Sequence, residues 1–291
     1  MSHFVLSLIC GALGHIILNL GHGFQKAGAH VLPLGLGALS TRARRVSLGL
    51  WTLGMALVLT GWGGIFAALS LGEAAVISAL GGLGLIALGL FSNFYLREGT
   101  SMREIVGIGT IVAGTVMVSL GGPQTDGTFR VSYPLLATYV TGWGAVCVLG
   151  LTLGWRARNL RATLAALAAG LSAGSSVLFQ KVSSGQCDFS PAHLASLPCL
   201  LKSPFIYLAL LAGLGAVILL QVAYQHGRAV EIVPVATGAL LLSPIFGALL
   251  SFGETLAMGQ WTGVVLIVLG MVCIATTEKK ALSKRTAWAS E

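Results

Sequence analysis

The sequence predicts an all-α polytopic membrane protein with nine transmembrane helices, and three observations lead to this class. The composition is 55% hydrophobic and only 9% charged, with a mean hydropathy of +0.89, so 291 residues carry too little polar surface to cover a soluble globule. The 40 glycines are typical of membrane helices, in which small residues let neighbouring backbones pack closely. Nine apolar stretches are long enough, at about 1.5 Å per residue, to cross a hydrocarbon core about 30 Å thick. We therefore expect a single membrane domain over residues 1–291.

The first four stretches cover residues 4–26, 47–70, 74–96 and 103–120. The first has no Lys or Arg ahead of it and lacks a clean small-residue cleavage site, so we expect a membrane helix there and not a cleaved signal peptide. The second follows a basic segment that ends at Arg45, and the third stops beside Arg97, which places charges at the edges of both helices.

The remaining five stretches cover residues 131–153, 160–182, 204–225, 229–252 and 257–276. Basic residues follow the first of them, and Pro204 is suited to a first helical turn. The last stretch is followed by a basic tail, residues 277–291, that we expect in the cytoplasm.

The chain repeats its own pattern. Phe24-Gln25-Lys26 returns as Phe179-Gln180-Lys181 at an offset of 155, and an offset of 156 then relates four further pairs: Glu98 and Glu254, Gly107 and Gly263, Ile111 and Ile267, Gly114 and Gly270. This predicts a first repeat over residues 4–120, a linker helix over 131–153 and a second repeat over 160–276. Because the linker crosses the membrane once, the second repeat would be inverted, an arrangement typical of transporters that open to alternate sides.

Four of these glycines form two pairs spaced seven residues apart, which places each pair on one helix face. Gly107 with Gly114 and Gly263 with Gly270 favour helix packing, and a homodimer interface is a possible second use.

The basic residues predict the orientation. If the first helix runs inward, fourteen basic residues lie inside: Lys26, Arg42, Arg44, Arg45, Arg97, Arg103, Arg156, Arg158, Arg161, Arg228, Lys279, Lys280, Lys284 and Arg285. Three lie outside: Arg130, Lys181 and Lys202. The positive-inside rule then predicts an outer N-terminus and a cytoplasmic C-terminus in a plasma (inner) membrane. The net charge of +8 is explained by the basic residues that set the topology and contact anionic lipid in the bilayer. We do not expect nucleic-acid binding, because the sequence contains no basic run interleaved with aromatic residues.

A polar stripe follows the first helix. His15, Asn19, His22 and Lys26 lie on one face, with Gln25 at its edge. Polar and ionisable groups in a membrane helix usually face the bundle interior or water, so these residues are candidates to line a solute cavity. The alternative is that His and Asn bond to neighbouring backbone while Lys26 reaches the inner interface.

The second repeat offers neutral donors and acceptors. The seventh stretch ends with Gln221, Tyr224 and Gln225, and the sixth carries Ser172, Ser175, Ser176 and Gln180. They could replace part of a solute's hydration shell, or they could tie helices together by hydrogen bonds.

Two carboxylates begin the hairpin helices of the two repeats. Glu73 and Glu231 could have a purely structural role, because a carboxylate is stabilised by the positive end of the helix dipole. Glu231 also precedes Pro234 by three residues, and a proline that removes a backbone donor is a common setting for ligand contact in transporters. Glu98 and Glu254 are expected to be interfacial structure.

Metal, redox and enzyme chemistry leave fewer signals. No Asp or Glu falls in the middle of a stretch, so a magnesium ion would have to keep most of its water, and two histidines seven apart are a weak site for a softer ion. Cys187 and Cys199 share an expected outer loop and could form a disulfide. No catalytic motif is present, so we expect neither an enzyme nor a cofactor.

The stretch Tyr224-Gln-His-Gly-Arg-Ala229-Val-Glu231-Ile-Val-Pro234, followed by Ser243-Pro244-Ile-Phe-Gly and the turn at Glu254, resembles the drug/metabolite transporter superfamily, EamA-like. Four helices, a linker and four more, with Phe-Gln-Lys closing the first, are similar to its NIPA-type magnesium-transporter branch. The resemblance implies alternating access and a divalent cation such as Mg²⁺ as substrate. A small polar metabolite or amino acid is the alternative, and a non-transporting membrane scaffold is a second one.

Overall fold

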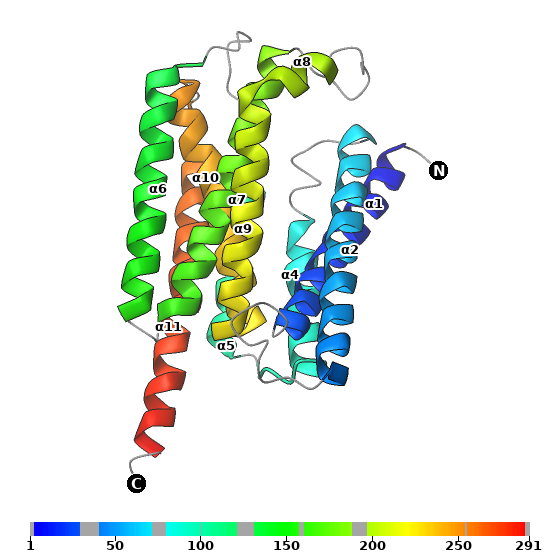
Figure 1. Ribbon diagram of the computed structural model, residues 1–291, viewed down its shortest axis with the longest axis vertical. Helices are drawn as coiled ribbons and strands as arrows, with labels where there is room; N and C mark the ends of the chain where they lie inside the picture. Colours follow the sequence, from blue (N-terminus) through cyan, green and yellow to red (C-terminus); the bar gives the residue numbers. More distant parts are fainter. Residues whose placement is uncertain are drawn as a thin grey trace.

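The computed structural model describes residues 3–29, 41–71, 80–99, 101–120, 131–156, 160–187, 197–253 and 255–288. Within these ranges the regular structure is entirely helical (Figure 1). In chain order the helices are α1 (His3–Gly28), α2 (Thr41–Leu71), α4 (Gly81–Phe94), α5 (Met102–Leu120), α6 (Tyr133–Arg156), α7 (Arg161–Gln186), α8 (Leu197–Lys202), α9 (Pro204–His226), α10 (Ala229–Ser251) and α11 (Met258–Trp288). The predicted all-α polytopic class is confirmed.

Eight of the described helices are long and apolar enough to cross a membrane, namely α1, α2, α5, α6, α7, α9, α10 and α11. The expected span at 74–96 corresponds to α4, whose described part is a 14-residue apolar helix. Its expected beginning, with Glu73 just before it, lies outside the described residues. The short helix α8 was not predicted. Large apolar side chains such as Leu211, Leu214 and Ile218 remain exposed on α9, as lipid-facing side chains would be.

The two ends of the bundle differ. At the lower end in Figure 1, α1, α4 and α9 finish, while α5, α7 and α10 begin, and Lys26, Arg97, Arg103, Arg161 and Arg228 gather there; we call it the basic end. The opposite end holds α8 and a disulfide between Cys187 and Cys199, whose Cα atoms are 5.7 Å apart. We call it the disulfide end. The sequence left this bridge open, and the structure contains it.

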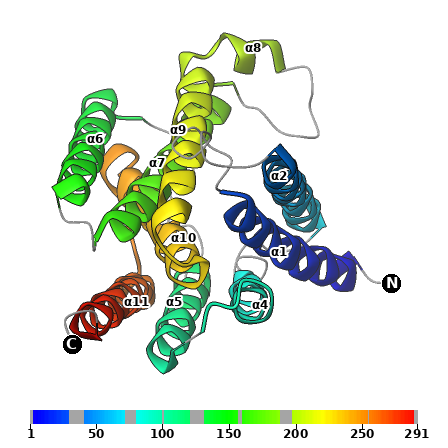
Figure 2. The same cartoon turned by 60° about the horizontal axis from the view of Figure 1, so that its bottom comes forward.

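Helices α1 and α2 pack along each other at one side of the bundle (Figures 1 and 2), and α1 also packs on α4. Their contact is a seam of glycines: a Cβ on Gly21 would lie 2.7 Å from the carbonyl oxygen of Gly54, and one on Gly61 would lie 2.8 Å from that of Gly14. Real Cβ atoms do not approach so closely, so only glycine allows the two backbones to touch.

A second glycine contact joins α5 to α11. Gly107 lies against Gly270, and Gly114 lies against Gly263, with each hypothetical Cβ between 2.5 and 3.0 Å from the carbonyl oxygen of its partner. The prediction that these four glycines serve helix packing is confirmed, and the packing is within one chain.

Helix α6, the expected linker, covers the outer side of α7 and α10 (Figure 2). The hydroxyl of Tyr139 donates to the carbonyl oxygen of Ser243 at 2.7 Å and lies 2.6 Å from its Oγ. This buried contact fixes α6 on α10.

Candidate functional site

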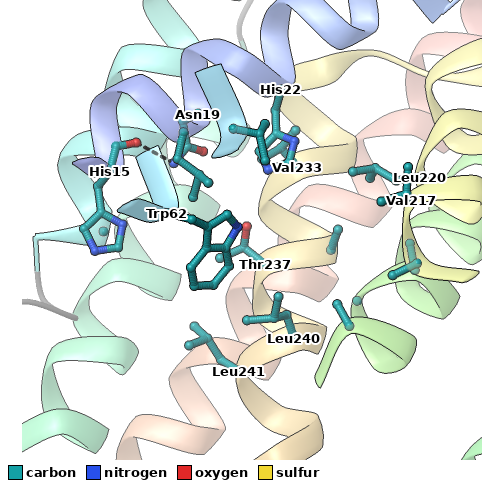
Figure 3. A pocket seen from close by; sticks show the side chains of 18 of the residues that line it. His15, Asn19, His22, Trp62, Val217, Leu220, Val233, Thr237, Leu240 and Leu241 are labelled. Atoms are coloured by element: carbon teal, nitrogen blue, oxygen red, sulfur yellow. Dashed lines mark hydrogen bonds between the residues drawn. The ribbon is translucent and has the colours of Figure 1, made fainter. Parts of the chain in front are cut away.

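A cavity of about 600 Å³ lies between the α1–α2 pair and the group formed by α7, α9 and α10, with contributions from α4 and α5. The described residues that line it include no Asp, Glu, Lys or Arg. Its walls are mainly apolar, and the polar groups are concentrated on α1 (Figure 3).

The polar wall consists of His15, Asn19, His22 and Gln25, all of which were predicted to line a cavity. Asn19 is only 5% exposed; its amide nitrogen donates to the His15 carbonyl oxygen at 3.0 Å, whereas its Oδ1 is buried without a hydrogen-bond partner. His22 Nδ1 lies 3.4 Å from Gln25 Oε1, which orients both side chains. Asn19 Oδ1 is therefore an acceptor within this wall that no protein group satisfies.

The opposite wall was not predicted. It is formed by Val217 and Leu220 of α9 and by Val233, Leu240 and Leu241 of α10 (Figure 3). The indole of Trp62 enters from α2, and Thr237 adds one hydroxyl. Nothing in the sequence separates such apolar residues from those that face lipid or the core, because all three environments select the same side chains.

Helix α9 supplies the second buried polar group of the cavity. Tyr224 lines it, and its hydroxyl is fully buried without a hydrogen-bond partner. Gln221, three residues earlier, is 2% exposed and has two unpartnered amide atoms, but it does not line the cavity. Buried polar atoms are nearly always satisfied by protein or water, so these groups indicate a place where water or a polar solute binds.

The serines of α7 have a structural role. Ser172 Oγ donates to the Ala212 carbonyl oxygen at 2.8 Å, and Ser176 Oγ donates to that of Ala209 at 2.7 Å, so both tie α7 to α9. Gln180 bonds in turn to Ser176. This is the helix-tying alternative of the two that the sequence left open, although Ser176 and Gln180 also line the cavity.

Glu231 lies away from the cavity. It is buried and pairs with Arg228, which also pairs with the fully buried Glu104 of α5. Burial alone would lower the pKa of the Arg228 guanidinium, but its bonds to Glu231 and Glu104 outweigh burial and raise that pKa. Glu73, the other candidate carboxylate, lies outside the described residues.

Two charged residues of this region, Arg228 and Glu104, were missed as candidates. Glu98, expected to be interfacial structure, accepts from Ser92 Oγ and the backbone N–H of Ala229, and Glu254 lies outside the described residues. The spacing of Arg228 and Glu231, three residues apart at the start of a helix, could have indicated their pairing. The pairing of Arg228 with Glu104 joins residues 124 apart in the chain and leaves no local signal.

The lining of the cavity is neutral and contains hydrogen-bonding side chains that a solute could use. Among the described residues, no group of three or more His, Cys, Asp or Glu side chains could hold a metal ion directly. What the cavity offers is a neutral hydrogen-bonding wall facing an apolar one.

Comparison with known proteins gives one partial similarity. Over 121 residues the chain is 32% identical to the protein named Probable magnesium transporter NIPA9, from Arabidopsis thaliana, and the match covers 40% of this chain and 34% of that protein. No protein-family model and no solved structure matches. The chain is thus an integral, multi-pass membrane protein, about two fifths of which is similar to a NIPA-type protein.

Proposed function

We propose that this protein is a transporter that moves a small solute by alternating access, and that the solute is a divalent cation such as Mg²⁺. The observation that carries the proposal is the cavity between two groups of helices, with unpartnered polar atoms on α1 and α9. The similarity to a protein named as a probable magnesium transporter supports the choice of ion.

The ion would travel with its water. Moving even a single unit charge from water to a low-dielectric interior costs on the order of 20 kcal/mol, and the cavity has no carboxylate to compensate a double charge. Six octahedral waters occupy about 180 Å³ at about 30 Å³ each, which the cavity of about 600 Å³ accommodates. Water bound to a cation donates hydrogen bonds, and Asn19 Oδ1 and the Tyr224 hydroxyl oxygen, which have no protein partner, would accept them after a side-chain rotation that exposes them to the cavity.

Inverted repeats are a common basis of alternating access, and the packing contacts support their presence here. Gly107 contacts Gly270. The equivalent of Gly107 in the second repeat, at an offset of 156, is Gly263, and the equivalent of Gly270 in the first repeat is Gly114. These two glycines are also in contact. Two contacts that exchange in this way are what a two-fold axis between repeats would produce.

The α1–α4 and α7–α10 contacts follow the same relation. Gly84 of α4 lies against His15 of α1, and the residues 155 positions later, Ala239 and Gly170, also lie against each other. The repeats differ in chemistry at this point, because the first places an imidazole where the second has glycine.

A small polar metabolite or amino acid is the second candidate. The absence of charged residues from the described lining, together with its extended apolar wall, favours an uncharged or zwitterionic solute with an apolar portion.

The test is Mg²⁺ uptake into liposomes that contain the purified protein and a trapped magnesium-sensitive dye, with and without an imposed pH or voltage gradient. We expect uptake above that of empty liposomes. Removing one hydrogen-bonding group by Asn19→Leu or Tyr224→Phe should reduce it by roughly 3- to 10-fold.

The matched controls are Asn93→Leu on the exposed face of α4 and Tyr207→Phe, whose exposed hydroxyl donates to the carbonyl oxygen of Leu201 in α8. Both should transport like the parent. Absence of uptake by folded, inserted protein would exclude Mg²⁺ as substrate, and counterflow of labelled amino acids would then test the second candidate.

A further inference from the structure

Helix α1 is fastened to α9 at the basic end. The ammonium group of Lys26 donates to the backbone carbonyl oxygens of Tyr224 and Gly227, and Gln225 Nε2 donates to the carbonyl oxygen of Ala29 at 3.2 Å. These bonds join the last turn of α1 to the last turn of α9, nearly 200 residues further along the chain. They lie next to the cavity, because Gln25 and Tyr224 also line it.

The turn between α9 and α10 is also bonded to the first repeat. Glu98 Oε2, in the α4–α5 turn, accepts from the backbone N–H of Ala229 at 2.9 Å and from Ser92 Oγ at 2.6 Å. Arg228 pairs with Glu104 at the start of α5 and donates to the Gly99 carbonyl oxygen at 2.5 Å. The α9–α10 turn is therefore a fixed point to which Lys26 attaches.

The two attachments differ in kind. The attachment of the turn to α4 and α5 includes a buried ion pair, whose separation would leave Glu104 as an uncompensated buried carboxylate. The attachment of α1 uses one flexible lysine and one glutamine bonded to backbone carbonyls, with the Lys26 ammonium also attracted by the charges of Glu98 and Glu231. Lysine is a mobile point charge on a flexible stem, so this is the attachment that can be released.

The shape of the bundle agrees with this difference. The α1–α2 pair comes close to α9 at the basic end and stands away from it toward the disulfide end (Figure 1). Helix α2 packs along α1 through the glycine seam, and α1 also packs on α4 through Phe24 and Phe91, so the pair would move together by pivoting on α4 when Lys26 is released.

We propose that Lys26, assisted by Gln225, is the latch of a gate that closes the cavity at the basic end. Release of Lys26 from the carbonyls of Tyr224 and Gly227 lets the α1–α2 pair swing away from α9 and exposes the cavity to that side of the membrane. The proposal rests on the alternating access proposed above, and it concerns which side of the cavity is open, whatever the solute.

Thiol accessibility tests this gate without any transport measurement. The reporter is Thr237→Cys in the cavity wall, in a protein whose Cys10, Cys147 and Cys273 are replaced by Ala while the Cys187–Cys199 disulfide is kept. A membrane-impermeant maleimide is applied separately to the membrane face that carries the C-terminus, which is the basic end, and to the opposite face.

We expect slow modification from the basic end in the parent. Lys26→Met should increase that rate about tenfold by raising the population open to that side, Gln225→Leu should increase it less, and Lys26→Arg should stay near the parent. The matched control is Lys181→Met, which removes the lysine at the corresponding position of the second repeat, where it lies 4.7 Å from the ring centroid of Phe252. It should leave the rate at the basic end unchanged.

Equal rates at the basic end for the parent, Lys26→Met and Gln225→Leu, all monodisperse after purification, would overturn the gate. An equal increase with Lys181→Met would overturn it too, because the effect would then be a general loosening. Neither result bears on Mg²⁺, so failure of the gate and failure of the proposed substrate are distinguishable.

Discussion

The contact between α5 and α11 permits a quantitative prediction from one added methyl group. In Gly114→Ala the new Cβ would lie 2.5 Å from the carbonyl oxygen of Gly263 and 2.9 Å from the backbone nitrogen of Ile267. Close C–H···O contacts in proteins have C···O distances of about 3.3 to 3.6 Å, so the helices must part by about 1 Å. Both obstructing atoms are backbone and cannot rotate away.

Overpacking of this kind costs roughly 1–3 kcal/mol. At roughly 2–4 °C per kcal/mol for a chain of this size, the midpoint of thermal unfolding should fall by about 2–12 °C. Unfolding of the detergent-purified protein, followed by tryptophan fluorescence, measures this change. The control is Gly109→Ala on the same helix, where a Cβ meets nothing within 4 Å and the higher helix propensity of alanine favours stability by up to about 1 kcal/mol.

If Gly114→Ala unfolds at the same temperature as Gly109→Ala, α5 and α11 do not touch at this position and the reasoning fails. The reciprocal variant Gly270→Ala, whose Cβ would lie 2.6 Å from the Gly107 carbonyl oxygen, should fall by a similar amount.

Three further predictions concern other contacts. Glu104→Gln removes a fully buried carboxylate from an ion pair with a partly exposed arginine, and it should lower the free energy of unfolding by about 1–3 kcal/mol, measured by the same thermal assay; an unchanged midpoint would contradict the pairing. Tyr139→Phe removes the hydroxyl that bonds to α10 and should cost about 1–2 kcal/mol, whereas Tyr207→Phe at an exposed site should cost less than half as much. Unfolded, unreduced protein should take up three polymer-linked maleimides on a gel and five after reduction, because Cys187 is bonded to Cys199; five before reduction would exclude the bridge.

The fold could be predicted from the sequence because it depends on local properties. Apolar length and basic edges located every spanning helix, and the four-three spacing from His15 to Asn19 and His22 placed one wall of the cavity. Seven-residue glycine spacing correctly indicated helix packing, since a helix returns to nearly the same face after two turns.

The rest of the site could not be predicted because it depends on contacts between distant segments. The acceptors of Lys26 are backbone carbonyls 198 and 201 residues away. Every residue has a backbone carbonyl, so the residue types in the sequence do not indicate which ones Lys26 bonds to. The apolar wall at Leu240 and Leu241 has the same composition as a lipid-facing surface. For Glu231, proximity to a proline suggested ligand contact, whereas its carboxylate is engaged by Arg228.

The glycine seam between α1 and α2 has a mechanical consequence. Two helices whose backbones touch at Gly21 and Gly54 cannot slide or rotate past one another without steric collision, so they behave as one stiff lever. Trp62 on α2 and Asn19 on α1 are carried by this lever at a fixed mutual distance. Any tilt of the lever therefore moves the indole and the amide together relative to the apolar wall of α9 and α10. In the alternating access that we propose, such a tilt would change the width of the cavity, while the pattern of groups on its polar side would stay the same.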